Sequence, residues 1–340
     1  MDQKANSDDL TRAELRIRSR RESELAEIGP LPVVSRPIGH VIVAALTPRA
    51  IKSRGKVNPQ RFFPGFCQRL AERGYATHFA FTGDELLTLS AQPNPSIIHL
   101  YNEENIIPDD AEVARAEARA RCVFNNLPTG RIIGKKAPTN RRLTERGILM
   151  PSMTPSPGAP VFSNAAASTS KPAWVLSGDG ALDDERYNTE FIDTTITVDG
   201  KDYLTTLRLM AVGRQIVLPY LGIREKDMRR PSVHGVSTPR DAALYNRVFD
   251  ELYVKREPEL RDLAGRLHEA IGAGFYHHDL LIESGTGRIL VCEVGYKFDP
   301  YAFSEHMAPI SDQVPSLAPL YDGTFARRSA DATIAEIEAS

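Results

Sequence analysis

The hydrophobic pattern begins with a thin apolar stripe near the N-terminus. Leu10, Ile17 and Leu25 recur at roughly helical spacing between arginines and glutamates, and a Gly-Pro step at residues 29–30 supplies a stop. This pattern predicts an exposed helix over residues 8–28. The helix could pack on the body of the protein or on a second subunit, although a solvated Arg/Glu-rich face is the simpler interpretation.

Apolar runs and amphipathic segments alternate over the next hundred residues. Residues 40–48 form a run typical of a buried strand, and Phe62, Phe66 and Leu70 share one face of a helix over residues 60–73. The runs ATHFAFTG and PSIIHLYN predict two more strands, and an Ala/Arg/Glu-rich helix leads into the short strand CVFNN. This order predicts a small layer of βαβ type.

An antiparallel meander is predicted over residues 187–221. Its alternating runs YNTEFIDTTITV, YLTTLRLMAV and QIVLPYL are separated by an Asp-Gly step at 199–200 and a Gly-Arg step at 213–214, which are hairpin signals. Arg208 shares a face of the middle run with Met210. A guanidinium among apolar side chains normally meets an anion, so Arg208 is a candidate anion-binding residue.

Residues 273–299 predict two apolar strands joined by a Gly-containing turn, with one carboxylate on each strand. Period-2 alternation places Asp279 on a face with Leu281, and Glu293 on a face with Val291. An unpaired carboxylate on a buried face is costly or stays protonated. Each acid therefore needs a counter-charge or a metal.

The loop between these strands decides whether the two acids share a site. A five-residue loop over 284–288 places Asp279 opposite Glu293, whereas a four-residue loop without a bulge places them on opposite faces. We predict the same face. Because alternate strand residues face opposite ways, His277, His278 and Asp279 cannot all bind one ion, and we expect His278 to be packed or hydrogen bonded.

Two polar segments could form binding loops. Residues 155–172, which follow a predicted helix over 137–146, are rich in Pro, Ser and Ala around a short strand at 160–162. They fit either a disordered linker or a hairpin whose tip lets backbone amides approach a phosphate. Residues 222–240 fit either a binding loop or a solvated connection.

Composition excludes several classes of protein. A hydrophobic content of 41%, a charged content of 25% and a net charge of −2 are typical of a soluble globular protein and give no general attraction to nucleic acid or membrane. The charged N-terminus lacks the apolar region of a secretory signal, and no run approaches the ~18 apolar residues of a membrane span. Three dispersed cysteines make neither a disulfide framework nor a CxxC site, so a reducing cytoplasm is predicted.

Four pieces of the chain, in this order, resemble the ATP-grasp superfamily over most of residues 30–310. None is specific alone, but their shared order is hard to obtain by chance. They are an Asn-Pro-like segment before Lys136 with a Gly-Ile-x-x-Pro run at 147–151, the segment TEFID, Arg208 followed by Val-Gly, and Asp279 followed by Glu-Val-Gly at 293–295.

The resemblance implies an α/β (α+β) ATP-grasp architecture, in which an N-terminal βα layer precedes nucleotide-binding antiparallel-sheet domains. We expect a charged N-terminal helix, an N-terminal α/β domain, a lid subdomain, a C-terminal subdomain with the metal site, and a tail with little pattern. These parts are expected at residues 1–30, 31–130, 131–188, 189–325 and 326–340.

The resemblance also implies roles in phosphoryl transfer, where a polyanion must be neutralised and held in line. Lys136 and Arg208 would hold phosphates of ATP, and Arg208 would act catalytically by stabilising charge during attack on an acyl phosphate. Asp279 and Glu293 would supply hard oxygen ligands to Mg²⁺. The segment expected to contact adenine and ribose comprises Glu190, Phe191, Ile192 and Asp193.

Two departures from the family pattern concern the site. Gly295 stands where the family has a metal-binding Asn, so one side-chain oxygen is lost unless water or another residue replaces it. The family's second lysine has no clean counterpart, because Lys171 lies beyond AAAST and this segment lacks the glycines of a phosphate loop.

The leading hypothesis is therefore an ATP- and Mg²⁺-dependent ligase that joins a carboxylate to an amine through an acyl phosphate. A small-molecule kinase on the same fold, or a nucleotide-binding or scaffolding protein without catalysis, are the alternatives. The expected partners are a small-molecule carboxylate and an amine, without nucleic acid or membrane, and a homodimer stays open. The carboxylate would meet Arg224, Arg229 and His234 beside the 222–240 loop.

Overall fold

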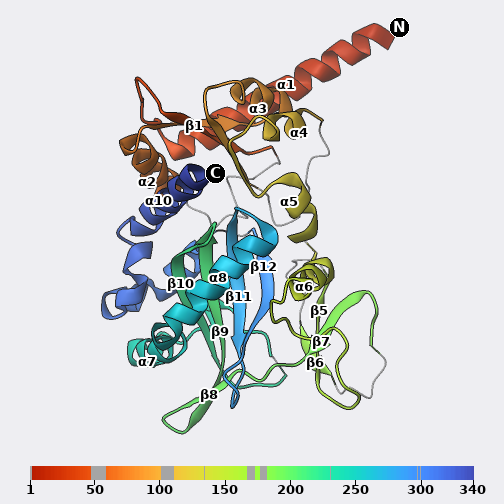
Figure 1. Ribbon diagram of the computed structural model, residues 1–340, viewed down its shortest axis with the longest axis vertical. Helices are drawn as coiled ribbons and strands as arrows, with labels where there is room; N and C mark the ends of the chain where they lie inside the picture. The colour runs from red at the N-terminus through yellow and green to blue at the C-terminus, as the bar shows by residue number, and fades with distance from the viewer. Residues whose placement is uncertain are drawn as a thin grey trace.

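The computed structural model describes residues 2–46, 59–100, 111–133, 135–166, 173–176, 182–229, 231–296, 298 and 300–340, with side chains described from residue 14 and, after the first gap, from residue 61. Its strands form three sheets, one parallel and two antiparallel, with helices packed between and around them (Figure 1). The α/β (α+β) class predicted from the sequence is confirmed.

The N-terminal sheet is parallel. Its strands lie in the order β2 (Tyr75–Ala80), β1 (Gly39–Ala44), β3 (Pro95–His99) and β4 (Cys122–Phe124). Helices α2 (Pro59–Glu72), α3 (Gly83–Leu89) and α4 (Ala111–Glu117) alternate with these strands along the chain. Every residue of β1 and β3 is buried, as expected where crossover helices cover both faces of a parallel sheet. The predicted βαβ layer is confirmed.

Helix α1 (Asp2–Ile28) is longer than predicted and packs on this layer through its last turns. Glu24 and Ile28 are buried, whereas Leu15 is 59% exposed. Arg20 donates to the carbonyl of Ala45, and Arg21 forms an ion pair of 2.6 Å with Glu85. The C-terminal part of α1 therefore packs on the body of the protein, which was one of the two interpretations of the sequence pattern.

The central sheet is antiparallel and holds the residues of greatest interest. Its order is β10–β9–β11–β12 with β8 paired to β9, and its strands are β8 (Thr195–Val198), β9 (Lys201–Val212), β10 (Gln215–Glu225), β11 (Phe275–Ile282) and β12 (Ile289–Gly295). Helix α8 (Glu257–Ile271), which follows α7 (Ala242–Leu252) in the chain, lies across one face of this sheet (Figure 1). The pairs Val198–Lys201 and Val212–Gln215 confirm both predicted hairpin turns.

The small third sheet has the order β6 (Trp174–Leu176), β5 (Val161–Ala165) and β7 (Arg186–Glu190), and lies near α5 (Leu127–Ile133) and α6 (Lys136–Glu145) (Figure 1). Strands β5 and β6 are antiparallel neighbours, which favours the hairpin interpretation of this segment. Residues 167–172, which include Lys171, lie outside the described residues.

The predicted meander is wrong in its first strand. Residues 187–198 form two strands in two sheets, because β7 pairs with β5 and β8 pairs with β9. Between them, the Asp193 carboxylate accepts hydrogen bonds from the backbone N–H of Thr195 at 3.0 Å and from its hydroxyl. An Asp side chain that bonds the backbone two residues on stabilises a turn in place of a continuous strand.

The predicted C-terminal tail is also wrong. Residues 324–339 form helix α10, whose small and apolar face is buried next to α2 (Figure 1). Phe325, Phe298 and Phe275 pack with Phe62 and Phe66 of α2, with ring centroids 5.1 to 6.1 Å apart. This aromatic cluster joins the N-terminal layer to the central sheet. No helix among the described residues is both long enough and apolar enough to cross a membrane.

Candidate functional site

A row of polar side chains crosses the central sheet. The strand register places Tyr220 of β10 opposite Arg208 of β9, Arg208 opposite Asp279 of β11, and Asp279 opposite Glu293 of β12. Residues paired across neighbouring strands project from the same face. We call these four residues the polar row; Lys136 adjoins it from helix α6.

The centre of the polar row is a bidentate ion pair. Arg208 donates from Nε to Oδ1 of Asp279 at 2.5 Å and from Nη2 to Oδ2 at 2.6 Å. Burial opposes charge on both groups, but their mutual attraction outweighs it: the pKa of Arg208 lies well above its usual value and the pKa of Asp279 lies below its own. Both side chains are therefore charged at neutral pH.

Tyr220 fixes the guanidinium from the other side. Arg208 donates from Nη1 to the Tyr220 hydroxyl at 3.3 Å, and the Tyr220 ring stacks on Phe303 with centroids 4.4 Å apart. The sequence reasoning missed Tyr220. An unbroken hairpin from the Val212–Gln215 pair would place Pro219 opposite Arg208, but a bulge between Ile216 and Leu218 moves Tyr220 into that place.

A second bulge places Glu293 in the row. Ile282 pairs with Ile289 and Leu280 with Val291, after which the register shifts so that Asp279 pairs with Glu293. The Glu283 N–H donates to the Arg288 carbonyl, so the turn is tighter than the five-residue loop we predicted. The predicted loop is wrong, and the predicted pairing of the two acids is confirmed, because Cys292 is the inserted residue.

Lys136 approaches Glu293 from the first residue of α6. Its Nζ lies 3.8 Å from Oε2 of Glu293 and donates to the Ala165 carbonyl at 3.3 Å, and the residue is only 9% exposed. Two cations, Lys136 and Arg208, thus face two carboxylates in a sheltered environment. The site is internally neutral.

The segment Glu190–Asp193 runs from the third sheet to the central one. The N–H groups of Glu190 and Phe191 donate to the carbonyls of Ser152 and Pro160, and the Asp193 carbonyl accepts from Ser284 at 2.7 Å. Ser284 belongs to the turn after β11, so the segment crosses beside the hairpin that carries both acids. Ile192 is buried, whereas the Asp193 side chain is 48% exposed.

The three predicted substrate residues do not all lie together. Arg224 donates to the Ser232 carbonyl at 3.2 Å, and the Ser232 hydroxyl lies 3.0 Å from Nε2 of His234. His234 is close enough to the polar row for the charges of Arg208 and Asp279 to act on it. Arg229 is different: its side chain is 90% exposed and paired with Asp227.

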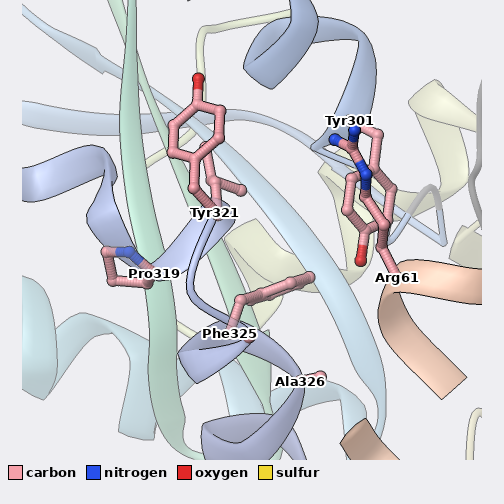
Figure 2. A pocket seen from close by; sticks show the side chains of 8 residues that line it. Arg61, Tyr301, Pro319, Tyr321, Phe325 and Ala326 are labelled. Atoms are coloured by element: carbon pink, nitrogen blue, oxygen red, sulfur yellow. The ribbon is translucent and has the colours of Figure 1, made fainter. Parts of the chain in front are cut away.

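A pocket lies apart from the polar row. It has a volume of about 330 Å³ and is lined by one cation, Arg61, and by mostly aromatic or apolar residues that include Tyr301, Tyr321 and Phe325 (Figure 2). Such a lining suits an apolar ligand with one negative charge. No residue of the polar row lines it.

The polar row does not amount to a protein-only metal site. Among the described residues, no three His, Cys, Asp or Glu side chains are arranged to hold a metal ion. Two carboxylates that face each other can still serve a metal whose other ligands come from a nucleotide, since Mg²⁺ commonly binds one or two carboxylates together with substrate phosphates.

Comparison with known proteins gives a likeness of fold. No protein-family model and no curated protein matches the chain. The structure is similar to a RimK domain protein ATP-grasp from Sphaerobacter thermophilus, with 15% identity, coverage of 86% of this chain and 98% of that one, and a TM-score of 0.44. It is similar to D-alanine–D-alanine ligase from Bacillus anthracis, with 10% identity, coverage of 86% and 99%, and a TM-score of 0.46.

A third similar structure is the ATP-grasp ligase PsnB complexed with the precursor peptide PsnA2 and AMPPNP, with 12% identity, coverage of 85% and 98%, and a TM-score of 0.48. The first and third of these structures are named as ATP-grasp proteins, the superfamily that the sequence motifs resemble, and the second and third are named as ligases. TM-scores below 0.5 carry no functional detail. The case for a function therefore lies in this chain's own side chains.

Proposed function

We propose that the protein is an ATP- and Mg²⁺-dependent ligase that joins a carboxylate to an amine through an acyl phosphate. The observation that carries the proposal is the polar row together with Lys136 of helix α6, because two cations and two carboxylates meet there. Phosphoryl transfer needs fixed positive charge around the phosphates and hard oxygen ligands for the metal that bridges them. The polar row offers both kinds of group.

Lys136 and Arg208 are the proposed phosphate-binding residues. Arg208 uses three of its five N–H donors in its bonds to Asp279 and Tyr220. It can therefore donate to a phosphate without breaking the bidentate pair. Lys136 makes a contact of 3.8 Å with Glu293, which is long for an ion pair and leaves it able to turn to a stronger anion.

Asp279 and Glu293 are the proposed metal ligands, together with phosphate oxygens and water. These residues would hold Mg²⁺, which would neutralise phosphate charge during transfer. When the amine attacks the acyl phosphate and displaces phosphate from the acyl carbon, Arg208 would stabilise the negative charge that develops on the carbonyl oxygen.

The nucleotide base is proposed to bind along residues 190–193. Because the N–H groups of Glu190 and Phe191 are already used, adenine would meet the backbone of Ile192, and the exposed Asp193 carboxylate would meet the ribose. Arg224 and His234 are proposed to bind the carboxylate substrate, because both lie near Ser232 and His234 adjoins the row. A reducing cytoplasm is the proposed setting, in line with three free cysteines.

Hydroxylamine trapping tests the proposal. The protein is incubated with ATP, Mg²⁺, hydroxylamine and a panel of carboxylic acids, and both ADP and hydroxamate are measured. A ligase releases ADP only when a suitable acid is present and forms the matching hydroxamate. Release of ADP that no acid alters, or a stable phosphorylated product without hydroxamate, would contradict the proposal.

A matched pair of variants sharpens this test. Arg208→Gln should abolish hydroxamate formation. Arg247→Gln makes the same chemical change at an exposed ion pair with Asp199, and should leave the activity unchanged. An equal loss of hydroxamate formation in both variants would mean that the loss does not depend on the polar row.

A nucleotide-binding protein without catalysis is the second candidate. It is favoured by Gly295, which supplies no side-chain oxygen, and by Asp279, whose two oxygens both accept from Arg208. Thermal unfolding with ATP, with and without Mg²⁺, separates the candidates from a protein that binds no nucleotide. A stabilising shift without any hydroxamate would support this second candidate.

A further inference from the structure

The pocket described above is formed by segments that are far apart in the sequence. Its lining comes from α2, from α9 (Tyr301–Met307), from the 3₁₀ helix η4 (Pro315–Leu320) with the turn that follows it, and from the first turn of α10. In Figure 2, Arg61 of α2 and Tyr301 of α9 lie on one side of the pocket, across from Tyr321. The fold therefore builds one cavity from the N-terminal and C-terminal parts of the chain.

The buried part of the lining is apolar. Leu320, Phe325 and Ala326 are at most 5% exposed. Phe325 also packs on Phe62 and Phe298 of the aromatic cluster, with ring centroids 5.5 and 5.3 Å away. Close packing behind Phe325 fixes this wall, so the pocket is formed before any ligand binds.

The exposed part of the lining carries the charge. Arg61 is exposed, and Tyr321 is 39% exposed. Burial raises the pKa of Tyr321 and the charge of Arg61 opposes this shift, so the guanidinium lies near the phenol. The Tyr321 hydroxyl donates to the Ser304 carbonyl at 2.7 Å, which leaves Arg61 as the donor for a ligand at this end. No Asp or Glu among the described residues lines the pocket.

We propose that this pocket binds an aromatic monocarboxylate, with its ring in the buried part of the pocket and its carboxylate against Arg61. Tyr301, Tyr321 and Phe325 line the pocket with aromatic rings, which pack well against the face or edge of another ring. A guanidinium pairs with a carboxylate through two parallel hydrogen bonds. One cation balances one negative charge, so a polyphosphate such as ATP does not match this site.

The volume of the pocket limits the size of the ligand. At about 330 Å³ it lies at the lower end of the range of roughly 300–1,000 Å³ that is typical of small-molecule sites. It holds roughly ten waters, at about 30 Å³ each in the liquid. Release of this water from an apolar lining favours binding of a ligand with one or two rings. A two-ring acid such as 2-naphthoate is therefore a suitable probe.

The inference does not rest on the proposed function. No residue of the polar row lines the pocket, and Lys136 does not line it either. Binding of the aromatic acid and binding of ATP are therefore separate properties of the chain, and each can be measured without the other.

Titration calorimetry of the full chain with 2-naphthoate and 2-naphthamide tests the inference. The amide has the same rings without the charge, so the acid should bind about tenfold more tightly. Arg61→Gln should weaken binding of the acid about tenfold and leave binding of the amide unchanged. Arg73→Gln makes the same change at an exposed arginine just beyond the other end of α2, and should leave both affinities unchanged.

Fluorine resonance of labelled tyrosines locates the bound acid. With 3-fluorotyrosine in the chain, the ¹⁹F signal that Tyr321→Phe removes belongs to Tyr321, and 2-naphthoate should shift this signal. Tyr203 of β9 lies outside the lining of the pocket, and Tyr203→Phe identifies its signal in the same way. The Tyr203 signal should stay in place.

The outcomes separate the inference from the proposed function. Equal affinity for acid and amide, a preference for the acid that survives Arg61→Gln, or binding that leaves the Tyr321 signal in place would each overturn the inference. None of these results would affect the ligase proposal. A chain that binds 2-naphthoate as expected but forms no hydroxamate with any acid would support the inference and count against the proposed function.

Discussion

The parallel and antiparallel sheets bury polar side chains in opposite ways. Strands β1 to β4, all of whose residues the structure describes, contain no Asp, Glu, Lys or Arg, and their buried polar residues are His, Ser and Thr. The central sheet instead carries Arg208, Asp279 and Glu293 side by side. One sheet avoids charge, and the other balances it.

The difference is clearest between the histidine pair of the first sheet and the ion pair of the second. His40 and His78 stack with ring nitrogens 2.9 Å apart, and burial lowers the pKa of both, so they are held neutral. Arg208 and Asp279 are held charged. A neutral pair has no means to attract a polyphosphate, whereas balanced charges can exchange one partner for a ligand. The chemistry is therefore expected in the central sheet.

The largest expected effect comes from breaking that balance. Arg208→Met leaves Asp279 without its bidentate partner, at a side-chain exposure of 14%. Removal of one partner of a buried pair typically costs about 3–5 kcal/mol. We expect a large fall in the urea midpoint and loss of ATP binding, both measured on the same preparation.

A double variant separates charge balance from function. Arg208→Met with Asp279→Leu removes both charges, and should recover much of the stability that the single variant loses. ATP binding should not return, because the cation is still missing. If the double variant is as unstable as Arg208→Met, the bidentate pair does not account for the loss.

A smaller effect on stability, with a selective effect on binding, is expected for Lys136→Met. Its contact with Glu293 is 3.8 Å long and Glu293 is 23% exposed, so the attraction lost with the charge is weak although Lys136 itself is buried. The stability should change by no more than about 1 kcal/mol. ATP affinity should fall at least about tenfold, as titration calorimetry would measure. Unchanged ATP affinity would remove Lys136 from the proposed site.

The strands of the polar row could be predicted from the sequence, but the register between them could not. Asp-Gly and Gly-Arg steps marked two turns, and Arg208, Asp279 and Glu293 stood out as charges on apolar strands. The alignment depends on two bulges, at Val217 and at Cys292, each of which inserts one residue into an outer strand. A bulge leaves little trace in an alternating pattern, so neither Tyr220 nor the tight turn before β12 could be predicted.

Helix α10 was missed for a different reason. Its buried face includes Ala326, Ser329, Ala330 and Thr333, short side chains that give a weak hydrophobic signal. They are buried because α10 lies close to α2, where a Cβ on Gly65 would lie 3.2 Å from the Cβ of Ala326. This close approach depends on both α2 and α10, so it cannot be predicted from the sequence of α10 alone. The domain limits before residue 326 and the homodimer stay predictions.

The smallest expected effect is a pH dependence of the first sheet. The folded pKa of His78 lies below its ordinary value of 6.5, because of burial and of the repulsion that His40 exerts when it is protonated. The unfolded chain therefore takes up a proton first as the pH falls, so this pair contributes full stability above about pH 6.5 and loses it below. The urea midpoint should fall between pH 7.5 and 5.5, and should fall less in His78→Gln.

The lowered pKa of Asp279 affects the stability in a different pH range. Its contribution to stability is present above the ordinary value of 3.8 and is lost only as the pH falls below it. Burial also lowers the pKa of other histidines, such as His278 to about 4, and stability is lost there too below about pH 6.5, so the informative quantity is the difference between wild type and His78→Gln. Equal pH dependence in both proteins would mean that the histidine pair is not held neutral by the fold, and the contrast between the two sheets would then rest on the polar row alone.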